Sequence, residues 1–236
     1  MSDEVTRRRF IGAAGGALAL AAGETALAQA AGGASGGKGL KIVAVSCSPR
    51  AGKTTALALR VCLEEAAKAG EGIETELIEL AGLKIPAQLA AGIPLEPGEK
   101  DDFPTLAPKL SDPAVAGIVI GTPVYFGNMS ALCKAFLDRW MTFRKENFAL
   151  SGKVGGVLAV GGARNGGQEL TIASVQTALM CHEMVIVGDG RPTGHFGATL
   201  WNSANDDISG DEFGLSTARN LGRRVAEVAL RLRGIA

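Results

Sequence analysis

The chain is short of aromatic residues and has no excess of charge of either sign. Aromatic residues make up 5% of its 236 residues, and Lys+Arg and Asp+Glu both total 24. A neutral chain lacks the electrostatic attraction that nucleic-acid-binding proteins use, so nucleic acid is not predicted as a partner. The hydrophobic share of 47% suffices for one substantial core.

Cysteines are also few, and no two of them form a C-x-x-C pair. The four lie far apart in the sequence, at Cys47, Cys62, Cys133 and Cys181. This spacing provides no compact metal or redox motif, so we predict no metal site and interpret all four as small core or loop residues. A disulfide between two of them stays open if the protein reaches an oxidising compartment.

A long apolar stretch that suits a membrane span is absent from the N-terminal region, which instead resembles an export signal. Residues 6–11 (TRRRFI) resemble the twin-arginine consensus, in which a hydroxyl residue and two arginines precede a spacer, Phe and an aliphatic residue. A mildly apolar stretch rich in Ala and Gly follows over 12–27, and 28–30 (AQA) fits a small-x-small cleavage site. A disordered or membrane-anchoring N-terminus is the alternative.

We therefore predict three segments. Residues 1–30 form a twin-arginine signal peptide, recognised by the twin-arginine translocation machinery, and this signal places the protein in the periplasm or outside the cell. Residues 31–39 form a flexible linker by composition. Residues 40–236 form the folded domain.

The folded domain begins with a strand, a polar turn and a helix. Residues 40–45 (LKIVAV) form a near-continuous apolar run, which is typical of a strand buried on both faces. Apolar residues then recur at helical spacing from 57 to 69. The turn between them, 46–55 (SCSPRAGKTT), carries hydroxyls, two cations and one glycine. Such a turn directs backbone N–H groups and a helix N-terminus to one spot, which suits an anion such as phosphate.

The same alternation of strand and helix continues along the chain. Further strands are predicted over 74–80, 116–121, 153–160 and 184–187, and further helices over 103–110, 130–140, 172–179 and 218–232. Five strands that alternate with helices predict an α/β fold with a parallel sheet and helices on both faces. The best match is the flavodoxin-like three-layer sandwich with strand order 2-1-3-4-5, whose ligand lies outside the carboxyl ends of the strands.

Three unusual segments follow the strands at that same edge of the predicted sheet. They are the polar turn after the first strand, the loop 122–129 (TPVYFGNM) after the third, and the loop 161–169 (GGARNGGQE) after the fourth. Two other irregular segments are predicted, an excursion over 81–102 and a long loop over 188–210. Because the three loops meet at the carboxyl edge, we predict a ligand site there.

The end of the first turn, Gly52-Lys53-Thr54, looks like the end of a nucleoside-triphosphate P-loop. The first glycine of that motif would coincide with Cys47, and Pro49 removes a backbone amide from the turn. No strand ends in an Asp suited to Mg²⁺, and no G-x-G-x-x-G follows the first strand. A single phosphate group, held by amides and hydroxyls of the turn, fits better.

Three motifs together resemble the NADPH-dependent FMN reductases and the related iron–sulfur flavoproteins. Ser48-Pro49-Arg50, with Thr55 five residues after Arg50, resembles that family's phosphate loop. Residues 123–139 (PVYFGNMSALCKAFLDR) are similar to its second loop and helix, and 161–169 to its third loop. The resemblance extends over residues 40–184. It implies that 40–236 is a flavodoxin-like domain that binds FMN non-covalently.

The resemblance also implies which residues contact FMN. Those expected at the phosphate are Ser48, Arg50, Thr54 and Thr55. Those expected along the ring edge and the ribityl chain are Pro123, Val124, Tyr125, Phe126, Gly127 and Asn128. Those expected to close over the isoalloxazine are Gly162, Ala163, Arg164, Asn165, Gly166 and Gly167. No catalytic side chain is predicted, because the flavin carries the chemistry.

One departure from the family pattern concerns the iron–sulfur members, which carry a compact cysteine cluster after the second strand. The corresponding segment here, 84–92 (KIPAQLAAG), has no cysteine. A cluster requires thiolate ligands. We therefore predict FMN, with NAD(P)H as the candidate reductant, and no iron–sulfur cluster.

The resemblance implies an FMN-dependent NAD(P)H oxidoreductase that passes reducing equivalents to a small acceptor such as a flavin or a quinone. A flavodoxin-like electron carrier between periplasmic protein partners is the alternative, and a binding module that has lost its flavin is a third. A dimer or tetramer is expected, with Trp140 and the loop 188–210 as candidate contact surfaces. His195 in that loop is either a structural residue or a cover over the flavin.

Other side chains likewise have a structural interpretation beside the functional one. Tyr125 and Phe126 are alternatively core residues at a strand end, and Arg164 is alternatively a solvated loop cation. Asp138 and Arg139 are predicted to form a structural pair rather than a catalytic one.

Overall fold

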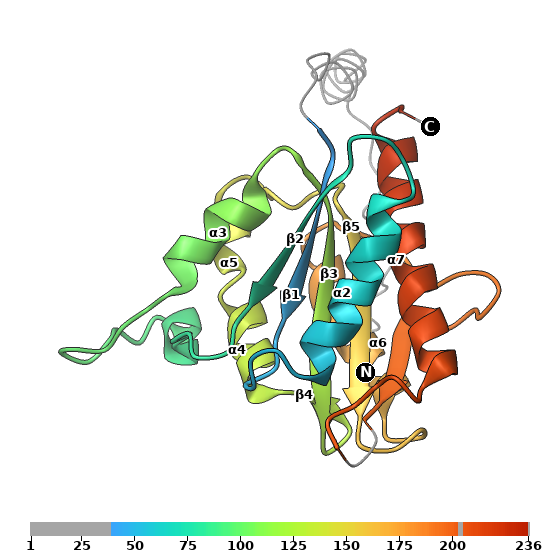
Figure 1. Cartoon of the computed structure of the whole chain (residues 1–236). Helices are drawn as coiled ribbons and strands as arrows, with labels where there is room; N and C mark the ends of the chain where they lie inside the picture. Colours follow the sequence, from blue (N-terminus) through green and yellow to red (C-terminus); the bar gives the residue numbers. More distant parts are fainter. Residues whose placement is uncertain (1–38, 203–204, 236) are drawn as a thin grey trace, which may run out of the picture. The chain divides into compact units, whose positions relative to one another are not determined.

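A computed structural model describes residues 39–202 and 205–235 (Figure 1). The predicted signal peptide and all but the last residue of the predicted linker lie outside the described residues. The described part forms a single unit from Gly39 onward.

A parallel sheet forms the middle layer of this unit. Its strands are β1 (Lys41–Ser46), β2 (Glu74–Glu79), β3 (Val115–Tyr125), β5 (Val154–Gly161), β6 (Val185–Ile186) and β7 (Ala198–Trp201). The two-residue strand β4 (Asn128–Met129) pairs antiparallel with the end of β3. Five of them run in the order β2-β1-β3-β5-β6, with all neighbours parallel. This arrangement confirms the predicted flavodoxin-like α/β fold and its strand order.

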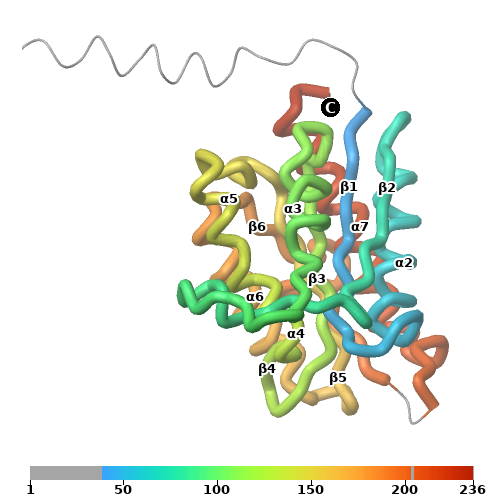
Figure 2. The backbone as a smooth tube through the Cα atoms, turned by 90° about the vertical axis from the view of Figure 1, so that its left-hand side faces the viewer, coloured from blue at the N-terminus to red at the C-terminus, as the bar shows by residue number. Residues whose placement is uncertain are grey.

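Helices cover both faces of the sheet, as Figures 1 and 2 show. One face carries α2 (Thr54–Ala67) and α7 (Glu212–Leu232); the other carries α3 (Phe103–Ser111), α4 (Ala131–Asp138), α5 (Met141–Lys145) and α6 (Gln168–Met180). Along β1, Ile42 and Ala44 point into the core beneath α2 and α7, whereas Val43 and Val45 point into the opposite core. Burial on both faces explains the continuous apolar run of this strand.

The segment 188–210, predicted as a single loop, contains strand β7. Strand β6 pairs with the first two residues of β5, and β7 pairs with the last four, both in parallel. Two short strands therefore share the position of the predicted fifth strand. A four-residue strand (ATLW) is too short to show a reliable period, so its existence depends on the pairing with β5.

The segment 122–129 is a β-hairpin rather than a loop. Strand β3 continues to Tyr125, and Val124 and Tyr125 pair with Met129 and Asn128 of β4. The two turn residues between them, Phe126 and Gly127, have φ angles of 51° and 75°. Positive φ at both central residues is typical of a type I′ hairpin turn, whose twist matches that of the strands.

The predicted helix 130–140 is broken into α4 and α5, with Trp140 between them. Trp140 is completely buried, and its ring meets Phe136 and Phe143 edge-on at 5.6 and 5.7 Å between ring centroids. The prediction that Trp140 forms a contact surface is therefore wrong. The aromatic cluster places this side chain in the core instead, because helix α5 folds back over it.

The excursion 81–102 carries a 3₁₀ helix, η1 (Ala87–Ala91), and is fixed to α4 by an ion pair. Arg139 donates two hydrogen bonds, of 2.9 and 2.7 Å, to the carboxylate of Asp101. The predicted pair of Asp138 with Arg139 is wrong, because Asp138 accepts a hydrogen bond from Lys134 one turn earlier. Adjacent residues of a helix point in different directions, so each binds another partner.

The C-terminal helix α7 begins at Glu212, six residues before the predicted start. The Asp211 side chain caps it by accepting a hydrogen bond of 2.9 Å from the Gly214 amide. Among the described helices, none combines the length and the apolar character needed to span a membrane.

Candidate functional site

The turn after β1 presents hydroxyls and free amides at the start of α2. The side chains of Ser48, Thr54 and Thr55 are all buried. The Ser48 hydroxyl accepts a hydrogen bond of 3.1 Å from the Arg50 amide, which closes the turn. No side chain caps the N-terminus of α2. The amide donors of its first turn therefore face the same spot as the hydroxyls, which is an anion-binding arrangement.

The two cations of this turn share one acidic partner that the sequence did not reveal. Arg50 lies 2.8 Å from a carboxylate oxygen of Asp206, and the Lys53 ammonium lies 3.6 Å from that carboxylate. The hydrogen bond from Arg50 lowers the pKa of Asp206. Asp206 lies 156 positions away from Arg50. Only the tertiary structure brings it to the turn.

The hairpin after β3 exposes two aromatic rings at the same edge of the sheet. Tyr125 is 45% exposed, and Phe126, at the tip of the turn, is completely exposed. The alternative that these two residues belong to the core is therefore wrong. Their neighbours Pro123 and Val124 are half-buried, and Asn128 is exposed.

Ser130 connects the hairpin to the first turn. It caps the following helix by accepting a hydrogen bond of 3.1 Å from the Cys133 amide. Its hydroxyl also donates to the Cys47 carbonyl at 2.7 Å, and its own amide donates to Thr122 Oγ1 at 3.1 Å. One buried serine thus connects the turn, the hairpin and α4 through hydrogen bonds.

The side chain of Gln168 stabilises the conformation of the loop after β5 through hydrogen bonds. The sequence did not indicate this role. Its buried carboxamide donates to the carbonyls of Ala163 and Leu200 at 2.7 and 3.0 Å, and accepts from the Gly166 amide at 2.8 Å. At the end of the loop, Gly167 has a φ of 93° and touches the hairpin: an added Cβ would lie 3.1 Å from Gly127 Cα. The second and third loops are therefore in contact.

The side chain of Arg164, in the third loop, contacts residues at the start of α7 and in β7. Its guanidinium forms an ion pair with the buried Asp211 and lies 5.9 Å from the centre of the Phe213 ring. It also reaches the Thr199 carbonyl at 3.4 Å. Its backbone remains in the loop that faces the hairpin, while its side chain connects the loop to the start of α7. Ala163 and Asn165 beside it are exposed.

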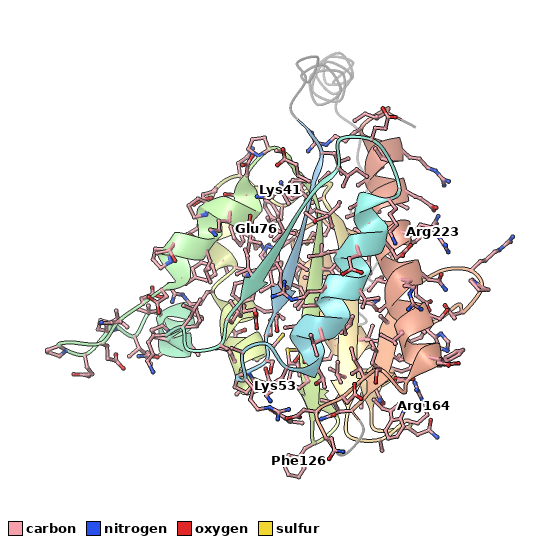
Figure 3. The ribbon with its side chains drawn as sticks, viewed as in Figure 1. Lys41, Lys53, Glu76, Phe126, Arg164 and Arg223 are labelled. Carbon is pink, nitrogen blue, oxygen red and sulfur yellow. The ribbon has the colours of Figure 1, made fainter. Side chains whose placement is uncertain are left out.

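Figure 3 shows that Lys53, Phe126 and Arg164 lie at one end of the unit, whereas the Lys41–Glu76 pair lies toward the other end. The three predicted loops therefore meet at the carboxyl edge of the sheet. His195 lies against Asp189, with Nδ1 3.3 Å from a carboxylate oxygen, and its ring meets Phe213 edge-on at 5.5 Å.

Three of the four cysteines lie in the core. Cys47, Cys62 and Cys133 are buried, Cys181 is exposed, and none of the four forms a disulfide. Burial raises the pKa of the Cys47 thiol, and the neighbouring Cys133 raises it further. Cys47 therefore stays protonated at neutral pH and is a poor nucleophile. Within residues 39–202 and 205–235, no three His, Cys, Asp or Glu side chains gather as a metal site.

Comparison with known proteins shows the family of this chain. A model of the NADPH-dependent FMN reductases matches residues 40–198, from the first strand into β7. The chain belongs to this family. The match includes all three loops described above.

Individual relatives and one solved structure are similar to this chain. The chain is 42% identical to an iron-sulfur flavoprotein of Methanocaldococcus jannaschii over 192 residues, which covers 80% of this chain and 97% of that one. It is 32% identical to an NAD(P)H dehydrogenase (quinone) of Chromohalobacter salexigens over 182 residues, covering 69% and 85%. The solved WrbA-like flavodoxin of Agrobacterium tumefaciens shares the fold, with a TM-score of 0.55, 22% identity, and coverage of 81% and 98%.

Family membership identifies the protein as an FMN-dependent oxidoreductase. The residues present fit FMN. The uncapped start of α2 supplies donors for a phosphate, and the exposed hairpin rings supply an apolar surface for a flat ring system.

Proposed function

We propose that this protein oxidises NAD(P)H through non-covalent FMN and passes the electrons to a small acceptor such as a free flavin or a quinone. One observation carries the proposal: the loops after β1, β3 and β5 are connected to one another through Ser130 and Gly167, and the N-terminus of α2 in the first of them is uncapped. A site of this kind holds a phosphate at one end and leaves apolar surface for a ring at the other.

The phosphate end uses the turn after β1. The hydroxyls of Ser48, Thr54 and Thr55 and the amides of the first turn of α2 donate to the FMN phosphate, and Arg50 adds positive charge. Arg50 must exchange at least part of its contact with Asp206 for this purpose. Lys53 contributes charge at longer range.

The ring end uses the hairpin and the third loop. Residues 123–128 line the ring edge and the ribityl chain, and residues 162–167 close over the isoalloxazine. Backbone amides there stabilise negative charge on the reduced ring. Bound FMN supplies the hydride and electron chemistry, so the protein's own task is to bind, orient and shield it.

Replacing Asp206 by asparagine is expected to tighten FMN binding about threefold, because exposed ion pairs are weak but this one competes for the phosphate's cations. Fluorescence titration of the apoprotein with FMN measures the change. Glu71→Gln, which removes one exposed negative charge elsewhere, is the matched control and is expected to change nothing. Unchanged or weaker FMN binding by Asp206→Asn would show that Asp206 does not compete with the phosphate.

A groove beside the flavin loops supports an apolar acceptor. It has a volume of about 790 Å³ and lies between η1 and the first turns of α4, which begin directly after the hairpin. Its apolar lining residues are Leu83, Ile85, Pro86, Ala131, Leu132 and Ala135, and its polar ones are Lys84, Gln88, Glu99 and Lys100. A cavity of this size and character suits a flat apolar molecule such as a quinone.

We further propose that the protein carries flavin and no iron–sulfur cluster. The M. jannaschii relative is named for such a cluster. In this chain the excursion has no cysteine, and Cys47 and Cys62 lie in cores on opposite faces of the sheet. Four thiolates cannot converge from such positions. Iron and sulfide analysis of anaerobically purified protein tests this, and one cluster per chain would overturn it.

Export by the twin-arginine route remains part of the proposal. It is supported by residues 6–11 and by the cleavage-site pattern at 28–30. Fractionation of the producing cells tests it, and recovery of the chain from the cytoplasm alone would contradict it. Export also favours the second candidate, an electron carrier between protein partners, because nicotinamide dinucleotides are expected to be scarce outside the cytoplasm.

Rapid mixing separates the two functions. Oxidised FMN-loaded protein is mixed anaerobically with NADPH or NADH while the flavin absorbance near roughly 450 nm is recorded. Prompt bleaching, followed by repeated turnover when a quinone is added, is expected. Flavin that only dithionite or a partner protein reduces would contradict the reductase and favour the carrier. Protein purified without flavin absorbance, and unable to bind added FMN, would contradict both.

A further inference from the structure

A second polar cavity lies away from the flavin loops, between the segment after β6 and the outer side of α7. It has a volume of about 370 Å³. Figure 3 shows Arg223, one of its lining residues, on α7 well apart from Lys53 and Phe126. The other cationic lining residues are Arg191 and Arg224, so three arginines line one small recess.

One of the three guanidinium groups is fixed in place by the fold. Arg223 donates from the same nitrogen to the Arg191 carbonyl at 3.0 Å and to Asn220 Oδ1 at 2.9 Å. Its Nε lies 3.7 Å from Glu227. Asn220 is fixed in turn, because its amide nitrogen donates to Thr193 Oγ1 at 2.8 Å. Hydrogen bonds therefore hold Arg223 and Asn220 in the wall of the cavity.

The two remaining arginines form no direct ion pair with an acid among the described residues. Within residues 39–202 and 205–235, the side chains of Arg191 and Arg224 have no hydrogen bond or ion pair. The stem of Arg224 packs over the bare Cα of Gly190, where an added Cβ would lie 3.6 Å from Arg224 Cδ. Gly190 also has a φ of 69°, which favours glycine. Because Gly190 has no side chain, the stem of Arg224 can pack directly against the loop backbone.

The cavity also contains two acids. Asp189 is buried, and its carboxylate accepts hydrogen bonds from the His195 amide and from the Thr193 hydroxyl. Glu227 lies beside Arg223. Three arginines against these two carboxylates leave the cavity with a net charge of about +1, which favours an anion.

We propose that this cavity binds a phosphate group of a small soluble molecule, at a site separate from the flavin. Arginine is suited to this task, because its planar fork donates two hydrogen bonds to one oxyanion. The volume accommodates a phosphate with a small organic group. The proposal does not depend on the reductase activity, since its residues take no part in the flavin loops.

The test uses protein saturated with FMN, so that the turn after β1 is occupied and added phosphate cannot bind there. Inorganic phosphate and glycerol 3-phosphate are titrated by calorimetry at constant ionic strength. Saturable binding of one anion per chain is expected. Absence of saturable binding of either anion would overturn the proposal, whatever the outcome of the NADPH experiment.

The matched variants are Arg191→Gln with Arg224→Gln, and Arg231→Gln as a control on an exposed arginine of the same helix outside the cavity. The double variant is expected to bind phosphate at least tenfold more weakly, because charge-assisted hydrogen bonds are lost. The control is expected to bind as the parent does. Equal affinity of the double variant and the control would overturn the proposal.

A lipid headgroup offers the same chemistry, so a second arm distinguishes the source. Vesicles of phosphatidylcholine with roughly 30% phosphatidylglycerol are tested by co-sedimentation. Free phosphate binding without vesicle binding is expected. Vesicle binding without saturable binding of free phosphate would overturn the assignment to a soluble ligand.

Discussion

Replacing Ser48 and Thr55 together by alanine is expected to weaken FMN binding about 100-fold, since each charge-assisted hydrogen bond contributes roughly tenfold in affinity. Both hydroxyls are buried at the uncapped start of α2, so no water replaces them easily at the phosphate. The loss is measured by fluorescence titration of the apoprotein with FMN.

Riboflavin provides the control, because it has the same ring and ribityl chain but no phosphate. The double variant is expected to bind riboflavin as the parent does. Thr105→Ala with Ser111→Ala on α3, away from the site, is the matched protein control. Unchanged FMN affinity of the Ser48 and Thr55 variant would mean that the phosphate lies elsewhere. Equal losses for FMN and riboflavin would indicate a collapsed turn.

Replacing Gly222 by alanine is expected to lower the free energy of unfolding by about 3 kcal/mol, because α7 crosses α2 at this residue. An added Cβ would lie 1.9 Å from the carbonyl oxygen of Cys62. The obstacle is backbone, so the two helices must separate, and the helix-forming advantage of alanine over glycine, about 1 kcal/mol, offsets only part of the cost.

Denaturant unfolding of the FMN-free protein measures this effect. Arg219→Ala, at an exposed position of the same helix, is expected to stay within about 0.5 kcal/mol of the parent. A stability of Gly222→Ala equal to or above that of the parent would show that α2 and α7 accommodate the methyl group by a small shift.

The sequence alone determined the architecture and the edge of the sheet at which the three loops meet. The apolar runs 40–45, 116–121 and 153–160 predict strands buried on both faces, and the helical patterns between them impose parallel pairing. Once the sheet is parallel, the loops after its strands must share one edge. The structure confirms that they do, and the family match extends over all three.

The tertiary structure decided features that depend on partners distant in the sequence. Strand β7 forms because it pairs in parallel with the last four residues of β5. Trp140 is buried because α5 folds back over it. Asp206 reaches Arg50 only through the return of the chain after β7, and Gln168 organises the third loop through a carbonyl of that same strand. Local patterns encode periodicity and turn chemistry, whereas hydrogen bonds and ion pairs between distant segments form only when the sheet brings those segments together.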